Sequence, residues 1–250
     1  MAENRRTAFV TGASQGIGAA IALALARDGF DVAVSSTRPE KLAAVVSGIE
    51  AAGARAVRVA LDVRSPELID KAMAQVVSAC GHLDVLVNNA GVPLKKPALD
   101  VTSKDWREVI DVNLKGTFFM SQQMGRHLVK VGKPGCIVSV ASTHGLVALA
   151  SRSAYGIAKA AVMQMTRMLA IEWAEHGIRV NAVAPGRVDT PTRAWSAGEP
   201  GYRESALARI PLRRFGTVDE VAAAVSYLVS PAARYITGQT LVLDGGLTAC

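Results

Sequence analysis

The sequence of 250 residues lacks several features that would assign it to a function class at once. Its three cysteines, Cys80, Cys136 and Cys250, are too few and too scattered for a disulfide framework or a metal cage. We therefore expect reduced thiols, a cytoplasmic location and no metal site. No uninterrupted apolar run reaches the roughly 18 residues of a membrane span. The polar start Met1–Arg6 leads directly into an apolar run, so we expect neither a signal peptide nor a membrane partner.

Aromatic residues are also scarce, at 5% of the chain, although the formal net charge is +7. A basic chain can bind nucleic acid, a membrane surface or an acidic small molecule. Here the basic residues form no run of five, and the aromatic residues are too sparse to serve as stacking platforms for bases. We expect no nucleic-acid partner. A phosphate-bearing cofactor would account for part of the charge, and solvated surface for the rest.

What the sequence has in quantity is hydrophobic residues, half of the chain, in short β-branched runs that alternate with helical patterns. This order predicts βαβ units and an α/β doubly wound parallel sheet of seven strands with helices on both faces. No linker or repeat interrupts it, so we expect one domain over residues 1–250. Residues 188–215 lack a clean period and are expected to form a substrate lid. The predicted strands are Thr7–Thr11, Asp31–Ser36, Ala56–Leu61, Leu83–Val87, Cys136–Val140, Arg179–Ala184 and Gln239–Leu243, and the predicted helices are Gly16–Asp28, Pro39–Ala52, Pro66–Cys80, Ser103–Lys130, Ser153–His176 and Thr217–Val229.

A glycine-rich turn joins the first strand to the first helix. In an open parallel sheet, ligands bind beyond the carboxyl ends of the strands. Gly12 would allow the tight turn, Gly16 would let the backbone approach a pyrophosphate, and Gly18 would permit close packing of helix and strand. The helix N-terminus adds free N–H groups and a positive dipole end. The turn therefore predicts a dinucleotide site.

Short motifs follow one another along the chain: Thr11-Gly12-x-x-x-Gly16-x-Gly18, Asn88-Asn89-Ala90-Gly91, Asn113, Ser142, Tyr155-x-x-x-Lys159, Pro185-Gly186 and Val188-x-Thr190. Their order resembles the short-chain dehydrogenase/reductase family, in its single-domain branch of similar length. The resemblance extends from Arg6 to Leu247 and implies a Rossmann-like fold. The sugar, ketone and 3-oxoacyl-carrier-protein reductases of the family are equally similar to this chain.

Tyr155 and Lys159 are four residues apart in a predicted helix, so they share one face. A free tyrosine has a pKa near about 10, and a nearby ammonium favours the phenolate. Tyr155 could then act as general acid or base on a carbonyl or an alcohol. The resemblance implies that Lys159 also holds ribose hydroxyls, that Ser142 bonds the substrate oxygen, and that Asn113 holds a water in a proton relay.

The nature of the cofactor depends on the end of the second strand. NAD-specific relatives carry an acid there, whereas this chain has Ser36 and, two residues later, Arg38. Small hydroxyls and a guanidinium suit a 2′-phosphate, so NADP(H) is favoured and NAD(H) stays possible. The resemblance, with these two residues, implies a cofactor site formed by Gly12, Ser14, Gln15, Gly16, Ile17, Gly18, Ser36, Arg38, Asp62, Val63, Asn89, Ala90, Gly91, Tyr155, Lys159, Pro185, Gly186, Val188 and Thr190.

The substrate is the least defined part of the prediction. The regions that form pocket walls in the family contribute His144, Arg152, Arg187 and Trp195 here, and the basic groups among them suit a polar or anionic small molecule. The favoured function is NADP(H)-dependent interconversion of a ketone or 3-oxoacyl carbonyl and a secondary alcohol. An NAD-dependent polyol or sugar-acid dehydrogenase is the alternative, followed by a non-catalytic nucleotide sensor. The family also implies a homotetramer or homodimer.

Overall fold

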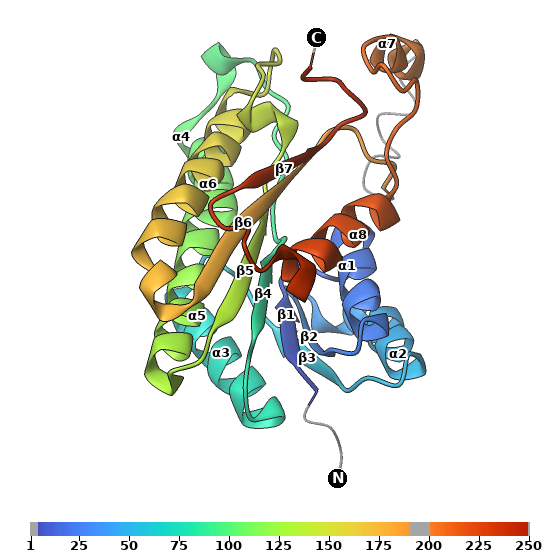
Figure 1. Ribbon diagram of the computed structural model, residues 1–250. Coiled ribbons are helices and arrows are strands. Elements are labelled where there is room, and N and C mark those ends of the chain that lie inside the picture. The colour runs from blue at the N-terminus through green and yellow to red at the C-terminus, as the bar shows by residue number, and fades with distance from the viewer. Residues whose placement is uncertain (1–4, 191–200, 250) are drawn as a thin grey trace.

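Seven parallel strands form one sheet in the computed structural model, which describes residues 5–190 and 201–249 (Figure 1). The strand order is β3-β2-β1-β4-β5-β6-β7, so the direction of winding reverses between β1 and β4. This is the predicted Rossmann-like doubly wound fold. The strands are β1 (Thr7–Val10), β2 (Asp31–Ser36), β3 (Ala56–Ala60), β4 (Val85–Asn88), β5 (Gly135–Val140), β6 (Ile178–Pro185) and β7 (Thr240–Leu243), and the helices are α1 (Gly16–Arg27), α2 (Ala43–Ala51), α3 (Pro66–Cys80), α4 (Ser103–Ile110), α5 (Thr117–Val131), α6 (Ser153–Glu172), α7 (Tyr202–Ala208) and α8 (Val218–Val229).

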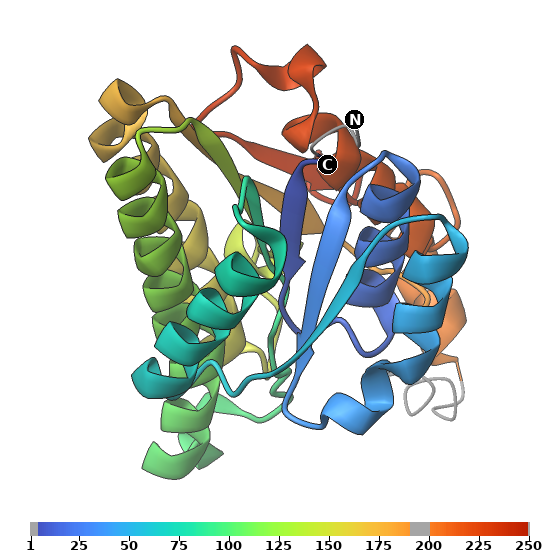
Figure 2. The ribbon, with the colours of Figure 1, turned by 90° about the horizontal axis from the view of Figure 1, so that it is seen from below.

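The sheet lies between two layers of helices, with α1, α2 and α8 on one side and α3, α5 and α6 on the other (Figures 1 and 2). Successive side chains of one strand enter opposite layers, because the side-chain period of a strand is two. In β1, Val10 packs against the α1 layer and Phe9 against the α3 layer, and both are fully buried. Both faces are therefore covered at the centre of the sheet, which is why β1 and β4 are buried along their whole length, whereas the edge strand β3 alternates buried and exposed residues.

The predicted long helix over 103–130 has a local irregularity at Asn113, one of the predicted catalytic residues. It runs as α4, then a π-helical segment Asp111–Gly116, then α5. Thr102 begins α4 with a reciprocal capping box to Asp105. The π turn contains Asn113 and brings Gly116 against the loop after β3, where a Cβ on Gly116 would lie 2.7 Å from Val63 Cγ2. Such bulges often occur at functional sites, and the apolar period of this sequence did not reveal this one.

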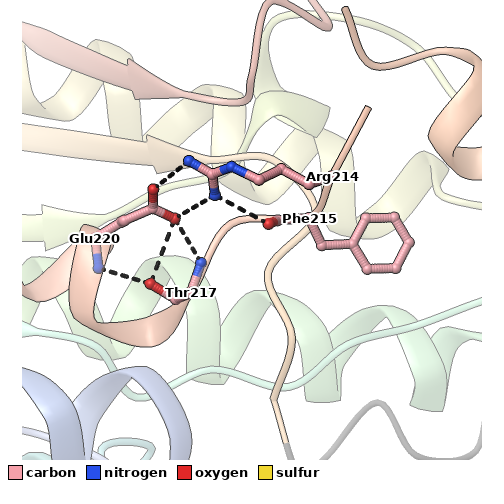
Figure 3. Close-up of polar contacts among 4 residues, drawn as sticks. All are labelled: Arg214, Phe215, Thr217 and Glu220. Carbon is pink, nitrogen blue, oxygen red and sulfur yellow. Dashed lines mark hydrogen bonds and ion pairs between the residues drawn. The ribbon is translucent and has the colours of Figure 1, made fainter. Parts of the chain in front are cut away.

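The expected lid over 188–215 is only partly within the described residues. Helix α7 lies in it, although the sequence showed no period there. Its base is closed by a parallel bridge between Val188 and Gly216. Figure 3 shows the junction with α8: Thr217 and Glu220 form a capping box, and Arg214 makes two hydrogen bonds of 2.6 and 2.9 Å to the Glu220 carboxylate.

The helices are too short or too polar to cross a bilayer, as judged over residues 5–190 and 201–249. Where the boundaries differ from prediction, the differences are small and local. The predicted second helix begins as a 3-10 turn, Pro39–Leu42, before α2, and α6 ends at Glu172 with a 3-10 turn, Ala174–His176, behind it. Helix ends commonly tighten in this way.

Candidate active site

One cleft of about 920 Å³ opens beyond the carboxyl ends of the strands, at the point where the strand order reverses. This is the place where open α/β sheets bind ligands. All the predicted catalytic and cofactor residues line it, as do His144, Arg152 and Arg187. Trp195 lies outside the described residues.

The glycine turn at the cleft floor is fixed to the end of β4. Gly12 has a φ of 64°, and a Cβ there would stand 2.8 Å from the Cα of Ala90. Only glycine fits both demands. The Thr11 hydroxyl accepts the backbone N–H groups of Asn89 and Ala90 at 3.1 Å, and the Asn89 amide donates to the Gly12 carbonyl at 2.9 Å. Sequence reasoning did not identify Thr11 as the clamp between these loops.

The first helix begins beside this turn with unfilled donors at its N-terminus. Gln15 occupies the cap position in an extended conformation and makes no side-chain cap bond to α1. The first N–H groups of a helix lack intrahelical acceptors, and the helix dipole favours an anion there. The turn and the α1 N-terminus therefore present the cradle that a pyrophosphate requires.

The end of the cleft formed by β2 and β3 is more basic than the sequence indicated. Arg38 lines it together with Lys41 and Arg64, two cations that sequence reasoning missed. Lys41 follows Arg38 by three residues in a 3-10 turn, a spacing that could have revealed it. Arg64 comes directly after the predicted Asp62-Val63 pair and grips the Asp62 carboxylate, with a shortest contact of 2.6 Å.

That ion pair favours the ionised form of Asp62. Hydrogen bonds from the Arg64 side chain hold the pKa of the Asp62 carboxyl below its usual value, against the opposing effect of burial. Both carboxylate oxygens accept from Arg64, at distances of 3.0 and 2.6 Å. Asp62 is thus an anchored carboxylate at the cleft wall. Its predicted contact with the adenine stays a prediction.

The catalytic candidates meet at the other end of the cleft. Lys159 on α6 is buried and its Nζ lies 5.8 Å from the centroid of the Tyr155 ring. The same Nζ donates to the Val140 carbonyl at 2.7 Å. Burial lowers the pKa of Lys159 to about 8, because removing an ammonium from water disfavours its charged form.

Asn113 and Ser142 hold the backbone around this pair. The Asn113 side-chain amide exchanges two hydrogen bonds with Val92, accepting from its N–H at 3.0 Å and donating to its carbonyl at 2.9 Å. A Cβ on Gly91 would lie 2.7 Å from Asn113 Oδ1 and 3.7 Å from Lys159 Nζ. The predicted relay residues therefore converge on Gly91, but the Asn113 side chain is engaged by backbone. Ser142 accepts the His144 N–H at 3.2 Å.

Two loops form the outer wall beside Tyr155. Arg152, at the start of α6, donates from Nη1 to the Leu94 carbonyl at 3.0 Å. The Lys96 N–H donates to the Ser151 carbonyl at 2.8 Å, which ties the same loops together a second time. The His144 ring stands edge-on to the Tyr155 ring at 6.1 Å between centroids. His144 thus contacts the tyrosine, while Arg152 joins the start of α6 to the neighbouring loop.

The fold and the cleft at its switch point define a Rossmann-like α/β protein built to hold an extended ligand across the strand ends. A family model described as enoyl-(acyl carrier protein) reductase matches residues 12–248. The 3-oxoacyl-[acyl-carrier-protein] reductase of Staphylococcus aureus is 39% identical over 243 residues, covering 97% of this chain and 98% of its own.

Solved structures agree closely with the architecture. A putative short-chain alcohol dehydrogenase from Sinorhizobium meliloti superposes with a TM-score of 0.95 at 41% identity, covering 98% of this chain and 96% of its own. A putative 2-deoxy-D-gluconate 3-dehydrogenase from Agrobacterium tumefaciens, solved with bound NADP, has a TM-score of 0.91 at 35% identity and covers 98% and 97%. The chain belongs to the short-chain dehydrogenase/reductase family and is an oxidoreductase.

Proposed function

We propose that this protein interconverts a ketone or 3-oxoacyl carbonyl and a secondary alcohol with NADP(H). The observation that carries the reaction is the meeting of Tyr155, Lys159 and Ser142 in one cleft that also contains the glycine turn. A proton donor, a buried ammonium and a hydroxyl lie together at one end, and the anion cradle lines the floor of the same cleft. This combination suits hydride transfer coupled to proton transfer.

The residues present fit a dinucleotide phosphate. Gly12 and the uncapped α1 N-terminus would hold the pyrophosphate, and Arg38 and Lys41 at the β2 end would hold the 2′-phosphate. An NAD site is expected to carry an acid after β2 that accepts the ribose hydroxyls. Among the described residues that line the cleft, no acid follows β2 directly. The bound NADP in the Agrobacterium relative is consistent with this preference.

In the reduction, the bound nicotinamide supplies the hydride to the carbonyl carbon. Tyr155 donates its phenolic proton to the carbonyl oxygen, and the new O–H bond completes the alcohol. Ser142 donates a hydrogen bond to the same oxygen and orients it. Lys159, held by Val140, stabilises the resulting phenolate by its positive charge. Oxidation of the alcohol follows the reverse path, with the Tyr155 phenolate as base.

The experiment compares NADPH and NADH oxidation against ketones, sugar acids and 3-oxoacyl thioesters. We expect NADPH to be preferred, and Arg38→Gln to weaken NADPH use by about tenfold or more while affecting NADH little, because a guanidinium–phosphate contact is charge-assisted. Arg58→Gln is the matched control, since Arg58 on β3 is exposed and does not line the cleft. Turnover with NADH alone would overturn the cofactor assignment. Full activity of Tyr155→Phe would overturn the proposed role of Tyr155 in carbonyl–alcohol interconversion.

We also propose a cytoplasmic homotetramer or homodimer. Helix α6 exposes Ile157, Met168 and Ile171, at 52, 51 and 79% of their surface. Apolar side chains on one helix at this exposure favour a subunit contact. Sedimentation measured at several protein concentrations tests the assembly, and a monomer at all of them would contradict it.

A further inference from the structure

The chain after β7 folds into a hydrogen-bonded turn, residues 244–248, at the carboxyl edge of the sheet (Figure 1). The carboxylate of Asp244 organises this turn. It accepts the Gly246 N–H at 2.9 Å, the Thr248 N–H at 2.8 Å and the Thr248 hydroxyl at 2.7 Å. Burial opposes ionisation of Asp244, but the hydrogen bonds outweigh it and hold the pKa of the carboxyl below its usual value. The turn is therefore fixed from within by an ionised side chain.

The 244–248 turn joins two segments that border the cleft. On one side, the Gly186 N–H after β6 donates to the Leu243 carbonyl at 2.9 Å. On the other side, the Leu212 N–H donates to the Gly245 carbonyl at 3.1 Å, and Leu212 belongs to the expected lid. The turn thus connects the predicted cofactor loop to the described part of the lid.

The strand order places this turn near the reacting end of the cleft. Val183 of β6 pairs with Val140 of β5 on one side and with Leu241 of β7 on the other, so the three residues form one row across the sheet. The Lys159 Nζ donates to the Val140 carbonyl, at one end of that row. Neighbouring strands lie about 4.8 Å apart, so β7 stands roughly 10 Å from β5. By contrast, β2, which leads to Arg38, is the fifth strand away from β7.

Leu247 is the part of the turn that reaches the cleft. Among the described residues that follow β7, Leu247 lines the cleft and the others do not. Directly before it, Gly246 has a φ of 90°, and a Cβ there would lie 2.9 Å from Pro211 Cγ. The backbone that carries the leucine is therefore packed against the lid. A leucine side chain offers no hydrogen bond, so a polar group pressed against it would lose its bonds to water without replacement.

We propose that Leu247 forms an apolar wall of the substrate pocket and limits the length of the alkyl group on the reacting carbonyl, with Asp244 as the residue that positions this wall. The inference rests on the proposed carbonyl–alcohol reaction and specifies which carbonyl compounds it accepts. Shortening the side chain should open the pocket toward β7. Each methylene that a longer substrate then buries should raise kcat/KM by about fourfold.

The first test uses three methyl ketones that differ only in chain length: 2-butanone, 2-hexanone and 2-octanone, each reduced with saturating cofactor. In Leu247→Ala, the ratio of kcat/KM for 2-octanone to that for 2-butanone should rise by about tenfold or more. In Leu247→Phe the same ratio should fall, because the larger ring narrows the pocket. Leu99→Ala is the matched control and should leave the ratio unchanged, since Leu99 is fully exposed and does not line the cleft.

The positioning role of Asp244 is tested with the same ratio. Asp244→Ala frees the turn and should raise the ratio, whereas Asp244→Asn should restore most of the original value because an amide oxygen still accepts hydrogen bonds. A general loss of folding lowers kcat/KM for all three ketones alike and leaves the ratio unchanged. Equal ratios in Leu247→Ala, Leu247→Phe and the unaltered protein would overturn the wall. A change in the Leu247 variants without one in Asp244→Ala would overturn the positioning role.

A second test is independent of turnover. The ketones are titrated calorimetrically into the protein saturated with NADP⁺, where ketone and cofactor are both oxidised and cannot react. Tighter binding of 2-octanone relative to 2-butanone in Leu247→Ala supports the wall even if no ketone is reduced, a result that would remove the proposed reaction alone. Reduction of the ketones with the same chain-length preference in every variant would remove the wall and leave the proposed reaction standing. Absence of binding by all three ketones, in the unaltered protein and in Leu247→Ala, would also overturn the wall.

Discussion

Burying the charged Lys159 costs folding free energy, and a substitution of this residue should reveal that cost. Its Nζ is buried and donates to the Val140 carbonyl at 2.7 Å, and burial lowers its pKa to about 8 from the ordinary lysine value of 10.5. We predict that Lys159→Met changes the pH dependence of stability in the protein without cofactor, because methionine fills similar space and carries no charge.

The magnitude follows from linkage. Below pH 8 the lysine is charged in both states, and the folded state bears the whole cost of burying it. Between pH 8 and 10.5 the unfolded state holds more protons, so stability rises with pH. The difference in pKa corresponds to a total of about 3 kcal/mol, at roughly 1.4 kcal/mol per unit. From pH 7 to pH 9, the recovered part is about 1 kcal/mol.

In Lys159→Met this recovery is absent, and the Val140 carbonyl loses its donor, which costs about 1–3 kcal/mol. At pH 7 the two effects nearly cancel, so the variant should be about as stable as the unaltered protein. At pH 9 the variant should be less stable than the unaltered protein. The difference in their free energies of unfolding should change by about 1 kcal/mol between pH 7 and pH 9.

The assay is urea unfolding of both proteins at pH 7 and pH 9 without cofactor. Lys130→Met serves as the control, because Lys130 is exposed on α5 and should show the same difference at both pH values. The reasoning would be refuted if the stability difference between Lys159→Met and the unaltered protein did not change with pH. That result would mean that burial does not lower the pKa of Lys159.

Three further outcomes are expected. Tyr155→Phe should lower turnover by at least about a hundredfold, the scale of general acid catalysis, while NADPH affinity measured by fluorescence titration changes little. A loss of NADPH affinity as large as the loss of turnover would mean that the tyrosine acts through cofactor binding instead. Thr217→Ala removes the α8 cap shown in Figure 3 and should lower the free energy of unfolding by about 1 kcal/mol. The melting temperature should then fall by roughly 2–4 °C. An unchanged melting temperature would mean that Glu220 and Arg214 hold the start of the helix without Thr217. Asn89→Ala removes two bonds to the glycine turn, at 3.0 and 2.9 Å, and should weaken cofactor binding more than it slows catalysis at saturating cofactor, which a KM and kcat comparison decides.

Much of the molecule could be predicted from the sequence because the signals are local. A parallel sheet covered on both sides needs strands that are mostly apolar, and β1 and β4 show this as short runs in which every residue is buried. The glycine turn and the Tyr155–Lys159 spacing are equally local. A turn that needs glycine, and two side chains one helical turn apart, are visible without any knowledge of distant residues.

Tertiary structure decided whatever depends on residues distant in the sequence. Thr11 clamps Asn89 across 78 positions, and Lys159 loses water only because Val140 and its neighbours enclose it. The π turn at Asn113 has no signature in the apolar period. The gathering of Arg38, Lys41 and Arg64 along one cleft depends on which strand ends face each other, since charge acts through space and a sequence records only its order along the chain.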